Sequence, residues 1–184
     1  MDVQAADPTI LVEARYAGPD NFTGAPLPGY EANRAYLRRE AAAALARVQA
    51  ALRPAGLGLK VSDGYRPIRA TQGMVAWTER VGRTDLLDDG YIARRSRHNL
   101  GLAVDLTLVD LATGRELSMG TAYDAFTEAA HTANAWGRER DNRQRLVTAM
   151  ETEGFENYEL EWWHFSFAVA GETPAFDVVV SGER

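Results

Sequence analysis

The sequence contains no cysteine and a single lysine, Lys60, among 184 residues. The absence of cysteine excludes disulfides, thiol nucleophiles, iron–sulfur clusters and zinc sites built from thiolates. Histidine is also scarce, since the chain has three: His98, His131 and His164. A metal ion would therefore have to be held by histidine, aspartate or glutamate side chains, and the surroundings of each histidine are informative.

Long apolar runs and basic stretches are missing as well. The apolar segment 41–46 is far shorter than the roughly 20 residues that span a bilayer. The formal net charge is −6, and no basic stripe suited to a phosphate backbone is present. We therefore expect neither a membrane span nor a nucleic-acid partner. Residues 1–7 lack the features of a secretory signal, and a trimmed leader would leave no trace, so the expected location is the cytoplasm or the periplasm.

What is present is typical of a folded protein, with 46 % hydrophobic and 25 % charged residues. The length suits one domain that spans residues 1–184. Proline and glycine interrupt residues 1–30, which are expected to be irregular, with short edge strands at 9–12 and 14–17.

Apolar periodicity predicts both helices and strands in the rest of the chain. The predicted helices are 31–53, 67–81, 125–135 and 138–153. The predicted strands are 57–62, 101–109, 161–169 and 176–180, and residues 86–95 are predicted to form a loop. Because the order lacks regular βαβ alternation, it favours an α+β fold with a mainly antiparallel central sheet flanked by helices.

Asp105 lies in the middle of the apolar strand 101–109. A carboxylate is costly to bury there unless it is paired or bound to a metal ion. If Val104 faces one side of the strand, Asp105 faces the other, beside Ala103 and Thr107. The simpler alternative is that this second face is open to solvent, and the strand alone leaves both interpretations open.

Two histidines can be related to this strand. His98 precedes Asp105 by seven residues, and Gly101 between them permits a sharp bend, so both side chains could reach one ion. His164 follows Glu161-Trp162-Trp163, and residues three apart on a regular strand point to opposite faces. Glu161 can thus share a site with His164 only from a bulge or a loop-to-strand junction. An exposed His98 and a core or surface His164 are the alternatives.

Two imidazoles and one carboxylate form a donor set typical of catalytic zinc, which keeps its fourth position open for water. Zinc lowers the pKa of bound water and polarises a substrate carbonyl. Glu161 could then take the proton of the water and pass it to a leaving amine. Arg66 could stabilise the oxyanion, although a surface ion pair is its simpler explanation. Trp162 and Trp163 are expected in the core or on a sheet face.

These segments resemble the signatures of the D-alanyl-D-alanine dipeptidases, which belong with the zinc D,D-peptidases. The first similar segment contains Ser96, His98, Gly101, Ala103 and Asp105, and the second contains Glu161, Trp163 and His164. Further similar stretches lie in the same order between about Tyr16 and Phe167: 21–24, 29–34, 63–67, 119–121, Asp124 and 154–155. The resemblance implies the α+β fold that D,D-peptidases share with the N-terminal signalling domain of hedgehog.

The resemblance also implies a role for each matching residue. His98, Asp105 and His164 would hold one Zn²⁺ per chain. Glu161 would be the catalytic base and Arg66 would stabilise the transition state. Asp124, assisted by Ser96, would hold the free ammonium of the substrate. From its own surroundings, Asp124 could instead be the N-cap of the helix 125–135. His131 matches no ligand and is expected on a helix surface.

The implied reaction is hydrolysis of D-Ala-D-Ala, or a close D,D-dipeptide, to free D-amino acids. The stretch from Arg66 to Ser96 is shorter than in a vancomycin-resistance member of the family, which leaves the substrate range open. One alternative is a D,D- or L,D-carboxypeptidase or endopeptidase acting on longer peptidoglycan peptides, against which Asp124 argues. Another is a non-catalytic zinc-bearing binding module, against which Glu161 and Arg66 argue. The oligomeric state, the metal bound in the cell and the biological role (antibiotic resistance or peptidoglycan recycling) stay open.

Overall fold

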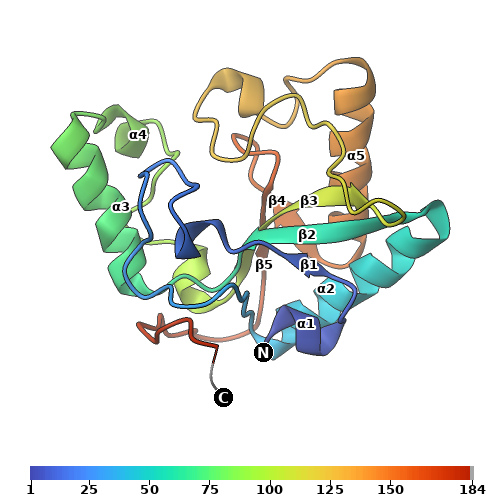
Figure 1. Cartoon of the computed structure of the whole chain (residues 1–184), viewed down its shortest axis with the longest axis horizontal. Helices are drawn as coiled ribbons and strands as arrows, with labels where there is room; N and C mark the ends of the chain where they lie inside the picture. Colours follow the sequence, from blue (N-terminus) through green and yellow to red (C-terminus); the bar gives the residue numbers. More distant parts are fainter. Residues whose placement is uncertain (183–184) are drawn as a thin grey trace.

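A five-stranded sheet forms the centre of the computed structural model, which describes residues 1–182 (Figure 1). The strands are β1 (Leu11–Val12), β2 (Leu57–Asp63), β3 (Ala103–Asp110), β4 (Phe155–Asn157) and β5 (His164–Phe167). Their order is β1-β2-β3-β5-β4, and every neighbouring pair is antiparallel except β1 and β2. The predicted α+β fold with a mainly antiparallel sheet is therefore confirmed.

Five α-helices and four 3₁₀ turns surround the sheet within the described residues. The α-helices are α1 (Val3–Ala6), α2 (Arg39–Leu52), α3 (Ile68–Val81), α4 (Asp85–Asp88) and α5 (Gly137–Thr152). The 3₁₀ turns are η1 (Arg15–Ala17), η2 (Arg53–Ala55), η3 (Arg97–Leu100) and η4 (Glu128–Ala130). In Figure 1, α2 and α5 lie on one side of the strands, and α3 and α4 lie together on the other. No helix in this part of the chain is long and apolar enough to cross a membrane.

Strand β3 separates two environments. Val104, Leu106 and Leu108 point into the main core, which also contains the apolar faces of α2 and α5. Asp105 and Thr107 lie on the other face of β3, and both are buried as well. The alternative in which this face of the strand is open to solvent is therefore wrong, and Asp105 is a carboxylate inside the protein.

A second hydrophobic cluster covers the Asp105 side of the molecule. It is formed by the N-terminal segment, α3, α4 and the loop that follows α4, and its buried members include Tyr16, Tyr30, Met74 and Ile92. Tyr16, Met74 and Ile92 also line a cavity that reaches Asp105. The candidate site thus lies between the sheet and this second cluster.

The predicted helix 31–53 begins at Arg39 instead of residue 31. Residues before Arg39 use their backbone groups for distant partners: the Leu37 N–H donates to the carbonyl of Met1, and the Arg38 N–H donates to that of Gly101. Those tertiary bonds replace the first helical turns. At the other end, Pro54 and the left-handed Gly56 stop the helix as predicted.

The predicted helix 125–135 is also wrong, because this segment forms only η4. Arg143 on α5 donates hydrogen bonds to the carbonyls of Met119, Ala129 and His131. The chain therefore wraps around one buried guanidinium instead of forming its own helical bonds. The helices predicted at 67–81 and 138–153 are confirmed as α3 and α5.

The strand predictions are right in the centre of the sheet and weaker at its edges. Strands β2 and β3 match the predictions closely, and β1 lies within the predicted edge strand 9–12. The other predicted edge strand, 14–17, is the turn η1. Segment 176–180 makes only an isolated bridge between Val180 and Tyr30, and the predicted strand 161–169 shortens to β5. Strand β4 and the single-turn helices α1 and α4 were not predicted.

Candidate metal centre and active site

His98, Asp105 and His164 meet at the start of β3. Asp105 pairs directly with His164 across β3 and β5, and His98 reaches them from the turn η3. The distance is 3.1 Å from His98 Nε2 to His164 Nδ1, 2.9 Å from His164 Nδ1 to Asp105 Oδ1, and 3.3 Å from His98 Nε2 to Asp105 Oδ1. Tetrahedral zinc with bonds of about 2.0–2.1 Å needs donor atoms about 3.3 Å apart. The three donor atoms are therefore spaced to share one ion.

The local chain holds His98 in the orientation that a ligand requires. Its Nδ1 lies 2.7 Å from the carbonyl oxygen of Gly64, so Nδ1 carries the proton and Nε2 offers its lone pair to the cluster. Ser96 caps η3 by accepting a hydrogen bond from the His98 N–H at 3.2 Å. Gly101 ends the turn at a φ of 66°, and a Cβ there would lie 3.3 Å from the backbone nitrogen of Arg38. A glycine suits this bend for both reasons.

The ionisation of the cluster suits a cation. Burial opposes the charge of Asp105, but the adjacent His98 and His164 outweigh it and hold the pKa of this carboxyl far below its usual value. Burial lowers the pKa of His164, so its imidazole is neutral at neutral pH. An ionised carboxylate and neutral imidazoles are the forms that bind metal. In residues 1–182 the cluster has these three members, which fits an ion with an open coordination position.

Arg66 is buried beside the cluster, so the surface ion pair considered from the sequence is wrong. Its Nε and Nη2 lie 2.9 and 2.8 Å from Asp63 Oδ2, and Nη2 lies 3.7 Å from Asp105 Oδ2. The guanidinium also stacks over the Tyr16 ring at 5.1 Å. Asp63 thus compensates most of the positive charge and holds the guanidinium in place.

Glu161 occupies the loop-to-strand junction that the sequence required of it. It precedes β5, and a tight turn joins its carbonyl to the His164 N–H at 3.2 Å. Its Oε2 lies 3.9 Å from His164 Nδ1, and the residue is buried. Burial, together with the negative charges of Asp105 and Asp124, raises the pKa of the Glu161 carboxyl well above its usual value. A carboxyl group of raised pKa can both take and return a proton.

Asp124 lies on the wall of the same cavity and caps no helix, so the N-cap interpretation is wrong. Its backbone has a φ of 58°, a left-handed conformation that aspartate tolerates better than most residues. Both carboxyl oxygens accept from the Tyr16 hydroxyl, at 3.0 and 3.2 Å. Burial and the charge of Asp105 raise the pKa of Asp124 to about 8. A cation bound beside Asp124 would lower this pKa again and so favour the negatively charged carboxylate.

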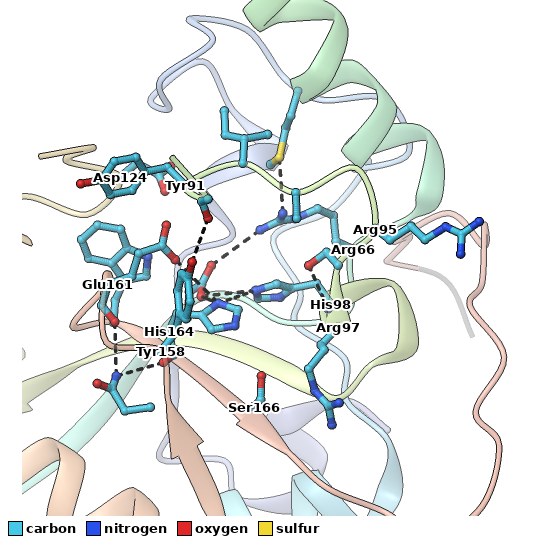
Figure 2. Close-up of a pocket in the computed structure, with 18 of the residues that line it drawn as sticks. Arg66, Tyr91, Arg95, Arg97, His98, Asp124, Tyr158, Glu161, His164 and Ser166 are labelled. Carbon is cyan, nitrogen blue, oxygen red and sulfur yellow. Dashed lines mark hydrogen bonds and ion pairs between the residues drawn. The ribbon is translucent and has the colours of Figure 1, made fainter. Parts of the chain in front are cut away.

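The cavity around these residues has a volume of about 500 Å³. Figure 2 shows Asp124 and Glu161 on one side of the two histidines, and Arg95 and Arg97 on the other. Arg97 is anchored by a 2.5 Å hydrogen bond from its Nη2 to the carbonyl of Phe167. Ser96 also lines the cavity. The lining of the cavity therefore includes both acidic and basic side chains.

Three residues of this region received no role from the sequence: Asp63, Tyr16 and Tyr123. Asp63 lies in the motif 63–67, where its spacing of three from Arg66 is a usable signal. The two tyrosines lie 107 positions apart and carry no local signal, yet their hydroxyls are 3.0 Å apart.

His131 is not on a helix surface as predicted: it follows η4, and its Nε2 lies 2.9 Å from the Tyr91 hydroxyl.

Two imidazoles and an ionised carboxylate surround space for one cation. A carboxyl group of raised pKa and a buried guanidinium face the same cavity. Metal-assisted hydrolysis needs a cation site, a proton carrier and a stabiliser of negative charge, and these side chains have the chemistry that those three parts require. Such a set of side chains is typical of metal-dependent hydrolases.

Comparisons with known proteins identify the group within that class. A family model described as D-ala-D-ala dipeptidase matches residues 1–180. The D-alanyl-D-alanine dipeptidase of Enterococcus faecium is 40 % identical over 168 residues, which cover 83 % of each chain. That of Escherichia coli K12 is 32 % identical over 176 residues, covering 95 % of this chain and 87 % of the relative. A vancomycin-resistance D,D-pentapeptidase solved in complex with Zn(II) aligns over 86 % of both chains, with a TM-score of 0.45 and 19 % identity.

The chain belongs to the D-Ala-D-Ala dipeptidase family and is a peptidase. The resemblance drawn from its motifs is thereby confirmed.

Proposed function

We propose that the protein hydrolyses D-Ala-D-Ala, or a close D,D-dipeptide with a free N-terminus, to free D-amino acids. One Zn²⁺ per chain would be held by His98, Asp105 and His164. The observation that carries the choice of substrate is the position of Asp124, a carboxyl group that shares the cavity of the metal cluster and has no cationic side chain bonded to it within residues 1–182. A substrate ammonium supplies that cation.

Zinc bound at the cluster supplies a water of lowered pKa and a Lewis acid for the peptide carbonyl. Glu161 takes a proton from the attacking water and returns it to the leaving amine nitrogen, which its raised pKa permits. Arg66 donates hydrogen bonds to the carbonyl oxygen as negative charge develops there. Because Asp63 fixes the guanidinium before substrate arrives, little reorganisation is needed at the moment of reaction.

The charge distribution of the cavity supports a small zwitterionic substrate. Asp124 binds the ammonium, assisted by Ser96 from the lining of the same cavity. Arg95 and Arg97 also line the cavity, and their positive charges favour the C-terminal carboxylate of a substrate at longer range. Both charged ends of a free dipeptide therefore meet a complementary charge.

A panel of substrates tests this function. The zinc-loaded protein should release D-alanine from D-Ala-D-Ala far faster than from N-acetyl-D-Ala-D-Ala or from a tripeptide ending in D-Ala-D-Ala. Blocking the ammonium leaves Asp124 without its cation and so costs binding energy. Equal rates on the acetylated dipeptide would contradict the assignment of Asp124 and favour a carboxypeptidase. The matched control is Asp124→Asn, which should reduce the preference for the free dipeptide.

Removal of the metal should lower the thermal stability of the protein. A ligand present at 100 times its Kd stabilises the folded state by about 2.7 kcal/mol, which corresponds to about 5–10 °C in Tm for a chain of this size. Adding a chelator to the zinc-loaded protein should therefore lower its Tm by an amount of that order in differential scanning fluorimetry. The variant His98→Ala should show almost no change with chelator. An equal decrease in both proteins would contradict a metal site at His98.

The metal-free protein should lose stability with rising pH through Asp124. The folded chain keeps the Asp124 proton up to about pH 8, whereas an unfolded chain releases it near pH 4. Between those values the folded state binds more protons, so the free energy of unfolding falls as pH rises, by up to about 1.4 kcal/mol per pH unit. This contribution is complete below about pH 4 and lost by about pH 8.

Asp124→Asn removes this pH dependence and keeps an acceptor for Tyr16. In urea unfolding of the metal-free proteins, the variant should gain on the wild type between pH 5 and pH 8. A constant difference across that range would show that Asp124 ionises normally in the folded state.

A further inference from the structure

The two carboxyl oxygens of Asp105 have different surroundings. Oδ1 faces the donor nitrogens of His98 and His164, at 3.3 and 2.9 Å. Oδ2 points away from them and lies 3.0 Å from the hydroxyl of Tyr123 and 3.7 Å from Arg66 Nη2. Tyr123 therefore makes the shorter contact to the oxygen that does not face the metal cluster.

The Tyr123 hydroxyl also continues toward Asp124. It lies 3.0 Å from the Tyr16 hydroxyl, which in turn lies 3.0 and 3.2 Å from the two oxygens of Asp124. The Tyr123 ring is held edge-on against Trp163, with ring centroids 5.5 Å apart. Two hydroxyl groups thus form a continuous bridge between Asp105 and Asp124.

Counting protons shows which way the Tyr123 hydroxyl donates. When Asp124 is ionised, Tyr16 donates to it and Tyr123 donates to Asp105, because a charged acceptor makes the stronger hydrogen bond. When Asp124 is protonated, it donates to Tyr16, Tyr16 donates to Tyr123, and Tyr123 again donates to Asp105. Tyr123 therefore donates to Asp105 Oδ2 in either state.

We propose that Tyr123 is a positioning residue that orients Asp105 for the metal and, through Tyr16, fixes the spacing between the metal centre and Asp124. Hydrogen bonds to the distal oxygen of a ligating carboxylate raise metal affinity by holding the ligand in its binding orientation. The fixed spacing selects substrates whose free ammonium and scissile carbonyl belong to the same residue, which is the case in a dipeptide. This second effect rests on the proposed function, whereas the effect on the metal does not.

Tyr123→Phe tests the proposal, since it removes one hydroxyl and keeps the ring against Trp163. Competition with a chelator of known affinity should show zinc binding weakened by about 10–100-fold. With zinc saturating, the KM for D-Ala-D-Ala should rise by about tenfold while kcat changes little, because a hydrogen bond in a charged network is lost from substrate binding. The preference for the dipeptide over the tripeptide should fall in parallel.

Two further tyrosine variants serve as controls. Tyr16→Phe loses the contact with Asp124 but none with Asp105, so it should raise KM and leave zinc affinity unchanged. Tyr158 packs its ring against His164, but its hydroxyl donates to the Gly90 carbonyl at 3.1 Å and not to a metal-binding residue. Tyr158→Phe removes only that hydroxyl, so its zinc affinity should also be unchanged.

Wild-type zinc affinity in Tyr123→Phe would overturn the proposal, and so would an equal loss in Tyr158→Phe. If the wild-type protein fails to cleave the dipeptide, the proposed function is wrong. The zinc competition still decides the role of Tyr123 in that case.

Discussion

Replacing Glu161 by glutamine should lower kcat for D-Ala-D-Ala by about 10²–10⁴-fold, the range in which a positioned acid–base group contributes. Glutamine has the same shape but cannot take a proton from water or return one to the leaving amine. Glu161 is buried on the cavity wall, and its pKa is raised by burial and by two neighbouring carboxyl groups. These features make it the strongest candidate for the proton carrier.

The zinc content of Glu161→Gln should remain at one ion per chain, because Glu161 lies outside the cluster of three donor atoms. Zinc analysis and steady-state kinetics on the same sample separate loss of chemistry from loss of metal. Glu159→Gln, two residues earlier and exposed, is the matched control and should retain full activity. Undiminished turnover in Glu161→Gln would show that another group carries the proton.

Replacing Arg66 by lysine should lower kcat by about 10²–10³-fold, the cost of losing one donor to a developing oxyanion. Lysine keeps the positive charge but not the planar fork that contacts Asp63 through two nitrogens. The ammonium would also lose the stacking over Tyr16. Charge alone is therefore expected to be insufficient.

Stability must be measured alongside activity for this variant, because Arg66 compensates the buried Asp63. The kinetics should be recorded well below the Tm of the variant. Arg69→Lys, an exposed arginine paired with Asp177, is the control and should change neither kcat nor KM. Near-normal kcat in a folded Arg66→Lys would contradict the oxyanion role.

The local sequence pattern predicted the part of the site that lies on or next to regular strands. The alternation in β3 placed Asp105 and Val104 on opposite faces, and the structure shows that arrangement. The bend at Gly101 returns His98 to the strand, as its spacing allowed. The condition that Glu161 lie at a junction before its strand is met as well. Each of these relations joins residues that are close together in the sequence, so local patterns are enough to predict them.

Relations between distant segments were not predictable. The start of α2 depends on hydrogen bonds to Met1 and Gly101, which no helical periodicity reveals. The segment around Asp124 does not form the helix that its local pattern predicts. Its backbone carbonyls on either side of Asp124 accept hydrogen bonds from the Arg143 guanidinium instead. The bridge from Tyr123 to Tyr16 likewise depends on tertiary packing. Tertiary contacts that override local propensity account for each of these differences.

Titration of the metal-free protein with Zn²⁺, followed by release of D-alanine from D-Ala-D-Ala, tests whether one bound zinc ion makes this protein a dipeptidase. We expect no release without metal, a rate that rises in proportion to added zinc, and a break at one equivalent per chain. Release by the metal-free protein, or no release at any zinc concentration, would contradict this expectation.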